Sequence, residues 1–283
     1  MAFRWIAILA ATAALASLTT PALAQSGPPA ATPHTPDGKP DLNGMWGGGP
    51  APRAAAFDVV MASRRCAPTQ VECDARTNQS IDGEFTGRSR PDQPLYKPQF
   101  WDRVQYLDMN TNKEDPIFRC QPYGIGRLGP PGRIVQSENE VIFLYRPGGG
   151  PQGGPQPADY RIIPTDGRPH DPIRAIDVTY YGDSVGKWER DTLVIDSVGF
   201  NDLTWLDVGG FFTSDQKHTI ERLRRDGDVL SYQVTIDDPE VLVEPWVMAP
   251  VLTPLNTDPT AYLPEGVPCK DYDSENMSSQ IRH

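Results

Sequence analysis

The chain has 283 residues, with 37 acidic and 26 basic side chains, which gives a formal net charge of −11 at pH 7. This negative charge disfavours nucleic acids and anionic membranes as partners. Its 30 prolines and 25 glycines exclude long helices, and its length is enough for one large β domain or two small ones.

The first 24 residues have the pattern of a secretory signal peptide. Arg4 precedes an apolar run over residues 6–18, and Ala22-Leu23-Ala24 has the small residues of a cleavage site. The apolar run is too short to span a membrane, which makes a retained membrane anchor the weaker alternative. We therefore expect a periplasmic or secreted protein that begins near Gln25.

The next segment, residues 25–40, is polar and rich in proline, which predicts an extended linker before a single β domain over residues 41–283. Near the start of that domain, Gly44-Met45-Trp46 resembles the G-x-W opening of calycin barrels, in which the tryptophan closes the barrel floor. An ordinary edge-strand tryptophan is an equal alternative. Residues 51–131 show no clear periodicity and predict a loop-rich cover with a short helix near residues 99–108.

From residue 132 the sequence changes to short β runs separated by turn residues, followed by a tail over residues 257–283. Strands spaced this closely, without helical periodicity between them, predict an all-β fold: an antiparallel meander closed as a calycin-like barrel or folded as a sandwich. Residues 147–157 predict a flexible hairpin loop. The strands are expected at residues 133–137, 141–145, 160–163, 178–188, 192–200, 218–225, 229–236 and 246–255, so the main strands occupy 132–256.

Four cysteines in an exported chain predict disulfide bonds, although three pairings are open. The short loop between Cys66 and Cys73 is easy to close, which would leave Cys120 to hold the tail through Cys269. Neither pair has the spacing of a zinc site and no histidine lies nearby, so we expect no metal at the cysteines.

One hairpin supplies the main functional hypothesis. Its turn, predicted at Asp226-Gly227, pairs Glu221 with Tyr232 and Leu223 with Leu230. The alternation of side chains along the two strands then defines an inner face. That face contains Thr219, Glu221, Leu223, Leu230, Tyr232 and Val234.

Glu221 is therefore expected inside the fold, among apolar groups and a tyrosine hydroxyl. Loss of water favours the protonated form of such a carboxylate unless a cation compensates, which suits it to proton transfer. A buried ion pair with an arginine is an equal alternative, and a bulge would exchange the two faces.

A second hairpin, with its turn at Arg190-Asp191, pairs Trp188 with Leu193 and Gly186 with Ile195 on another inward face. Gly186 leaves space that either a ligand or a crossing strand can fill, and packing is the commoner use.

The loop after this hairpin is rich in polar and aromatic side chains, as loops that carry function often are. Asn201 would donate to a developing negative charge, Trp205 would stack on a planar substrate, and Asp207 would orient a histidine. A turn cap is an equal alternative for Asn201.

Two of the four histidines lie at strand ends, where they would reach one rim of the fold. These are His170 and His218, and either imidazole would exchange protons near neutral pH. A metal held by both and by a carboxylate is a weaker alternative, because the spacing sets no ligand geometry.

Several stretches read TPDGKPDLNGMW, LDMNTNKEDPIFRCQPYGIGR, DGRPHD, SVGKWERDTLVIDSVGFNDLTWLD, HTIERLRR and VTIDDPEVLVEPW. Together they resemble a widespread family of exported bacterial proteins of unknown function with a GKWEGDTLVVDT-like core. The resemblance covers most of the mature chain. It implies that Cys120 and Cys269 belong to the shared framework, that Cys66 and Cys73 are an addition, and that Arg190 stands where relatives usually have glycine.

These observations favour a cofactor-independent enzyme that acts by proton transfer on a small apolar or aromatic molecule, as a lyase, isomerase or hydratase. No nucleotide-binding, phosphate-loop or hydrolase motif is present in the sequence, and the oligomeric state is open. A non-catalytic periplasmic carrier and a metal-assisted hydrolase are the alternatives. In the enzyme, Glu221, His218 and His170 would act as acid and base, Tyr232 and Asn201 would stabilise negative charge, and Trp46, Trp188 and Trp205 would line the cavity with Asp207 beside them.

Overall fold

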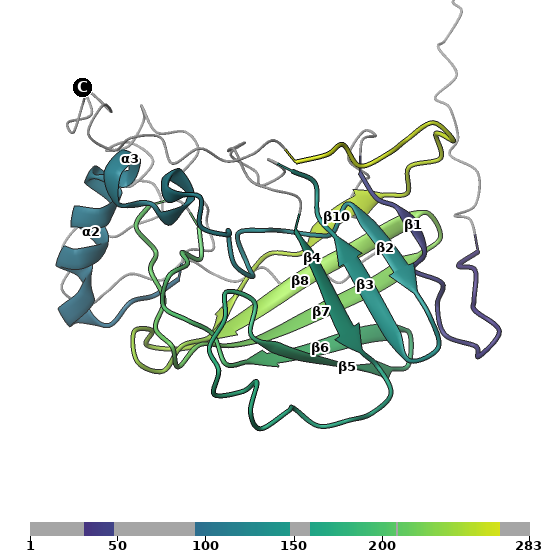
Figure 1. Cartoon of the computed structure of the whole chain (residues 1–283), viewed down its shortest axis with the longest axis horizontal. Helices are drawn as coiled ribbons and strands as arrows, with labels where there is room; N and C mark the ends of the chain where they lie inside the picture. The colour runs from purple at the N-terminus through teal and green to yellow at the C-terminus, as the bar shows by residue number, and fades with distance from the viewer. Residues whose placement is uncertain (1–30, 48–93, 148–158, 208, 267–283) are drawn as a thin grey trace, which may run out of the picture.

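The computed structural model describes residues 31–47, 94–147, 159–207 and 209–266. These residues form two antiparallel β-sheets with two short helices at one end (Figure 1), which confirms a mainly β fold. The predicted signal peptide, most of the glycine-rich loop and three of the cysteines, Cys66, Cys73 and Cys269, lie outside these ranges. The cysteine pairing therefore stays a prediction.

The first sheet has four strands in the order β1-β2-β3-β4. Their side chains alternate between a buried face, which includes Phe143 and Ile163, and an outer face, which includes Val135 and Ile162. The strands are β1 (Gly44–Met45), β2 (Arg133–Gln136), β3 (Glu140–Leu144) and β4 (Tyr160–Pro164).

The second sheet has the order β10-β8-β7-β6-β5, with β9 also paired to β8. The run predicted over residues 246–255 is divided into two strands around Pro250, whose missing N–H cannot join a ladder. The strands are β5 (Asp183–Glu189), β6 (Thr192–Val198), β7 (His218–Asp226), β8 (Val229–Asp237), β9 (Trp246–Val247) and β10 (Val251–Pro254).

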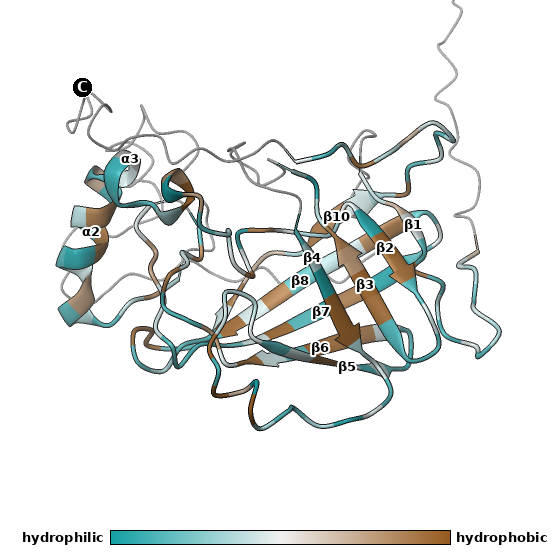
Figure 2. Ribbon diagram, viewed as in Figure 1, coloured by the Kyte–Doolittle hydropathy of each residue, from teal (hydrophilic) through white to brown (hydrophobic). Residues whose placement is uncertain are grey.

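The apolar faces of the two sheets meet in one core, and Figure 2 shows hydrophobic residues along the strands of both sheets. At one edge, Trp46 pairs with Leu255 and so connects the end of β1 to the end of β10. Trp46 is buried beneath the Arg225 guanidinium, whose central carbon lies 5.3 Å from the ring centroid. Within the described ranges no ladder joins β4 to β5, so the architecture is that of two sheets.

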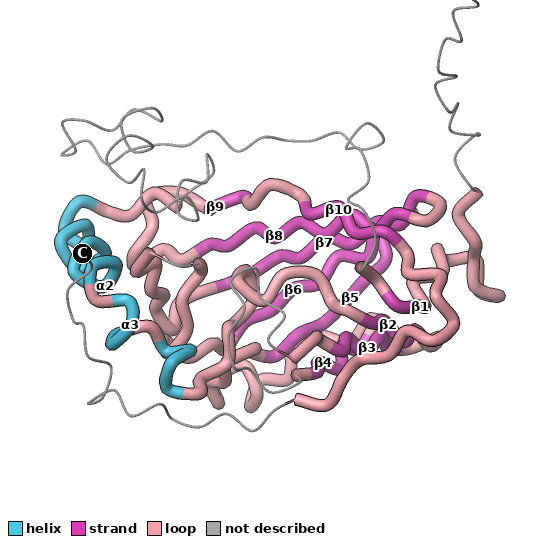
Figure 3. The backbone as a smooth tube through the Cα atoms, turned by 90° about the horizontal axis from the view of Figure 1, so that it is seen from above, coloured by secondary structure: helices cyan, strands magenta, loops and turns pink. Residues whose placement is uncertain are grey.

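Two helices lie at one end of the sheets (Figure 3): α2 (Trp101–Met109) and α3 (Thr111–Glu114), flanked by 3₁₀ turns at Pro98–Phe100 and Pro116–Arg119. α2 corresponds to the helix predicted over residues 99–108. The segment after the 3₁₀ turn is held by a buried ion pair, in which Arg127 donates two hydrogen bonds to Asp115 at 2.8 and 2.9 Å.

The turn of the β7–β8 hairpin is one residue away from its predicted position. Asp226 pairs with Val229, so Gly227 and Asp228 form the turn, and Gly227 takes a φ of 56°. A two-residue turn with glycine first suits the twist of a hairpin. Glu221 consequently pairs with Val234, and the predicted pairing with Tyr232 is wrong. Because partners change by two residues, each side chain keeps its face, and Glu221 is inside the fold as predicted.

The β5–β6 hairpin has the predicted register, with Trp188 opposite Leu193 and Gly186 opposite Ile195. The space above Gly186 is filled by the first sheet, because a Cβ atom there would lie 3.0 Å from Thr165 Cγ2. Gly186 thus allows a close approach of the two sheets.

Candidate functional site

A buried polar cluster lies between the two sheets, around Glu221. Arg161 reaches it from β4 and donates from Nη1 to Oε1 at 2.9 Å and from Nη2 to Oε2 at 2.6 Å. The Tyr232 hydroxyl also donates to Oε1, at 2.8 Å. Glu221 is 0% exposed and Arg161 5% exposed, so the ion pair is removed from water.

The two terminal nitrogens of Arg161 also donate to other members of this cluster, to Ser184 Oγ at 2.9 Å and to the Tyr145 hydroxyl at 3.3 Å, whereas its buried Nε has no hydrogen-bond partner among the described residues. Burial raises the pKa of the Tyr145 and Tyr232 hydroxyls, and the charge of Glu221 raises both further. Both carboxylate oxygens of Glu221 are thus occupied by fixed donors. This is the geometry of the structural ion pair that the sequence left open as an alternative.

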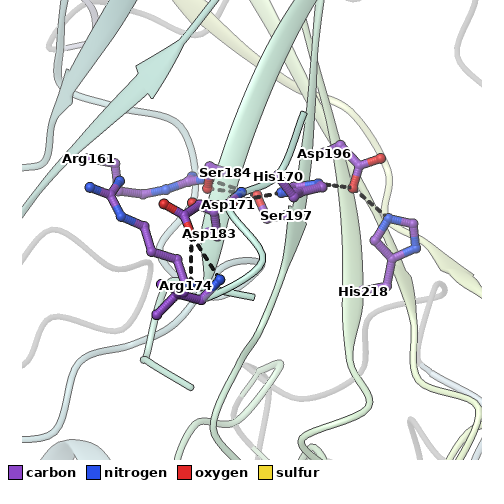
Figure 4. Close-up of polar contacts among 10 residues, drawn as sticks. Arg161, His170, Asp171, Arg174, Asp183, Ser184, Asp196, Ser197 and His218 are labelled. Carbon is purple, nitrogen blue, oxygen red and sulfur yellow. Dashed lines mark hydrogen bonds and ion pairs between the residues drawn. The ribbon is translucent and has the colours of Figure 1, made fainter. Parts of the chain in front are cut away.

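A second polar cluster lies on the outer face of the β5–β8 sheet, where His170 and His218 contact one carboxylate (Figure 4). Asp196 Oδ1 is 3.3 Å from His170 Nε2 and 2.8 Å from His218 Nε2. The other ring nitrogen of His170, Nδ1, is 2.9 Å from Asp183 Oδ2. The two histidines therefore lie together on the outer face of the sheet, at the carboxylate of Asp196.

Strand alternation explains why the two clusters do not converge. Ile195 pairs with Glu221 on the inner face, and the next pair, Asp196 and Ile220, points outward. His218 lies on the outward side of β7, two residues before Ile220. The sheet therefore separates Glu221 and Tyr232 from His170 and His218, and they do not share one cavity.

The contacts of the two histidines limit which ring nitrogens can donate and which can accept. His170 has a carboxylate at each ring nitrogen, and only an imidazolium donates to both. His218 has its Nε2 at Asp196, and within the described residues no hydrogen bond is made by its Nδ1. When Nε2 donates to Asp196, Nδ1 is left as an acceptor, which is how a carboxylate sets the tautomer of a catalytic histidine.

A groove of about 340 Å³ adjoins Asp196 on this outer face. Its walls come from three adjacent strands and from the loop before His170. The side chains that line it include Val185 and Lys187 of β5, Val194 and Asp196 of β6, and Ile220 and Arg222 of β7.

The remaining predicted site residues lie elsewhere. Asn201 Oδ1 accepts from the Leu203 N–H at 3.2 Å, which matches the turn cap left open by the sequence. Trp205 is buried in the core, and Asp207, two residues further along the chain, is also buried. Trp188 is partly buried and packs against the core. Trp46 borders a separate pocket of about 210 Å³ at the β1–β10 edge.

Sequence reasoning missed Lys217, which is buried in the core. Its ammonium donates to Thr204 Oγ1 at 2.9 Å and lies 4.5 Å from the centroid of the Phe200 ring. Burial lowers the pKa of Lys217 to about 7, against a smaller opposing effect of Asp238. Continuing the alternation of β7 by one residue, from outward His218, would have placed Lys217 inside.

Across the described part of the chain, no set of three or more His, Cys, Asp or Glu side chains is arranged to hold a metal ion. The same residues contain no helix of the length and apolarity needed to span a membrane. Comparisons of the chain with protein-family models, with curated proteins and with solved structures found no match.

Proposed function

We propose that the protein is an exported enzyme that transfers protons on a small apolar or aromatic molecule, with Asp196, His170 and His218 as its acid–base group. The observation that carries the proposal is the carboxylate shared by two imidazoles at the wall of a groove. Export is inferred from the leader-like pattern of residues 1–24.

Each member of the group has a separate part in this proposal. Asp196 accepts both imidazoles at Oδ1, and within the described residues its Oδ2 has no hydrogen bond. Oδ2 is therefore the atom that takes a proton from a substrate in the groove. Asp196, with 44% of its side chain exposed, returns that proton to water, while His218 and His170 donate to Oδ1 and hold the carboxylate in place.

The inner cluster has a different part. Arg161 and Tyr232 occupy the carboxylate oxygens of Glu221. We assign Glu221 to holding the two sheets together, which moves the proposed chemistry from the inner face to the outer one.

We further infer a calycin-like barrel for the complete β domain. The pairing of Trp46 with Leu255 supports this, because it joins the first strand of one sheet to the last strand of the other.

The test uses nitrobenzisoxazole, an aromatic probe of positioned bases. Removal of its ring C–H proton breaks the N–O bond and releases a coloured cyanophenolate, so no cofactor enters the reaction. We expect the protein to accelerate ring opening. Asp196→Asn should lower the rate at least about ten-fold, since positioned bases contribute roughly 10²–10⁴-fold. His218→Gln should lower it less.

His34→Gln is the matched control, because it removes a histidine whose backbone pairs with Pro40 near the N-terminal end of the described chain. An Asp196→Asn variant that keeps the full rate would overturn the proposal. Saturable binding of the probe with no acceleration would instead support the non-catalytic carrier.

A further inference from the structure

The side chains of the groove form two rows across the strands. Val185, Asp196 and Ile220 are cross-strand neighbours in one row, and Lys187, Val194 and Arg222 are neighbours in the next. Two residues along a strand span about 7 Å. The proposed base and the two cations therefore lie in adjacent rows, separated by about that distance.

The row of cations carries excess positive charge. Lys187 Nζ is 3.0 Å from Glu189 Oε1, and Arg222 Nη1 is 3.3 Å from Glu189 Oε2. The single carboxylate of Glu189 thus contacts both cations, so Lys187, Arg222 and Glu189 together carry one positive charge. The trio thus has the opposite sign to the chain as a whole, whose net charge is −11, while the Asp196 carboxylate in the adjacent row is negative.

The floor between the two cations is apolar. Val194 lies between Lys187 and Arg222 in its row and is buried, while Val185 and Ile220 flank Asp196 in the other row. A polar solute would gain nothing from these three side chains, whereas an apolar or aromatic body would lose water-exposed surface against them.

We propose that this groove takes a small organic anion with an aromatic or branched apolar body. The anionic group lies in the row of Lys187 and Arg222, the body extends from Val194 towards Val185 and Ile220, and the proton-exchanging end reaches Asp196. The last of these contacts rests on the proposed function, whereas the first two do not. The spacing of about 7 Å between rows suits a para-substituted aromatic carboxylate or sulfonate.

The experiment compares para-nitrobenzoate with para-nitrobenzamide, which have the same shape and differ in charge at one end. Dissociation constants come from NMR titration of the isotope-labelled protein. The wild type should bind the benzoate at least about three-fold more tightly than the amide, as expected for one partly exposed charge pair.

Two variants should move the benzoate affinity in opposite directions. Arg222→Gln removes a cation and should weaken binding about three-fold, whereas Glu189→Gln removes the competing carboxylate and should strengthen it by a similar factor. Neither should change the amide affinity. Arg224→Gln is the matched control, because it removes the same charge from the same strand one row further from Asp196.

Equal affinities for benzoate and amide in the wild type would overturn the inference, as would benzoate affinities that both variants shift in the same direction. These binding measurements require no turnover. A failure here, with Asp196-dependent ring opening of nitrobenzisoxazole intact, refutes the anionic ligand alone. If the benzoate binds as expected but Asp196→Asn keeps the full rate of ring opening, the acid–base group alone is refuted.

Discussion

Replacing Glu221 by glutamine distinguishes a structural from a catalytic role for this residue. If Glu221 were the acid–base group, Glu221→Gln would keep the fold and abolish turnover. The contacts with Arg161 predict the opposite. The amide cannot accept both guanidinium donors as a carboxylate does, and it leaves Arg161 as a buried cation without a counter-charge.

The size of the effect follows from these contacts. Glu221 accepts two charge-assisted hydrogen bonds from Arg161 and one from Tyr232, and all three residues are buried. Removing one partner of a buried ion pair typically costs about 3–5 kcal/mol of unfolding free energy. Replacing both partners by apolar residues removes the uncompensated charge, so Arg161→Met combined with Glu221→Leu should recover much of that loss.

Urea denaturation followed by tryptophan fluorescence measures each variant and closes the double-mutant cycle. Glu189→Gln is the control, because it removes a carboxylate from exposed ion pairs that are worth about 1 kcal/mol or less. A Glu221→Gln variant within about 1 kcal/mol of the wild type would refute the reasoning. It would also return Glu221 to the list of possible catalytic groups.

Two further changes test features outside the inner cluster. Lys217 has its pKa lowered from 10.5 to about 7 by burial, so the unfolded chain binds more protons between these values and stability should rise with pH across that window. At about 1.4 kcal/mol per pKa unit, the free energy of unfolding should rise by about 5 kcal/mol across this window. Urea titrations from pH 6 to 10.5 measure this rise. Lys217→Met should abolish it, and the control Lys113→Met should not. Arg190 has a left-handed φ of 55°, a conformation that glycine adopts more easily than residues with a Cβ atom. Arg190→Gly should therefore raise the free energy of unfolding by up to about 1 kcal/mol, whereas Arg190→Ala should not. Equal melting temperatures for the wild type and both variants would contradict the assigned turn.

The features that the sequence predicted well depend on local pairing. Both β-hairpins follow from turn residues and alternation, and the inward position of Glu221 survives a misplaced turn because the pairing moves by two residues. The predicted strand over residues 178–188 begins too early, because Val178-Thr179-Tyr180-Tyr181 has strand composition. The structure begins β5 at Asp183.

Contacts between the sheets were harder to predict, because hairpin register says nothing about which strand of the other sheet lies opposite. Arg161 is 60 residues from Glu221 in the sequence. A signal was nevertheless present: alternation in β4 places Arg161 on the same face as Ile163, so the sequence contained one inward cation as well as one inward carboxylate. Matching the two would have favoured the ion pair.

The same alternation explains why chemistry and stability can be separated in this fold. Asp196 and Glu221 belong to neighbouring strands and lie one residue out of step, so one faces the groove and the other faces the core. They share no hydrogen-bond partner among the described side chains. A variant of Glu221 should therefore change the urea midpoint while Asp196→Asn leaves it nearly unchanged, and only Asp196→Asn should reach the probe reaction through the groove. A single midpoint shift common to both variants would mean that the two faces of the sheet are coupled, and the division of roles between them would have to be abandoned.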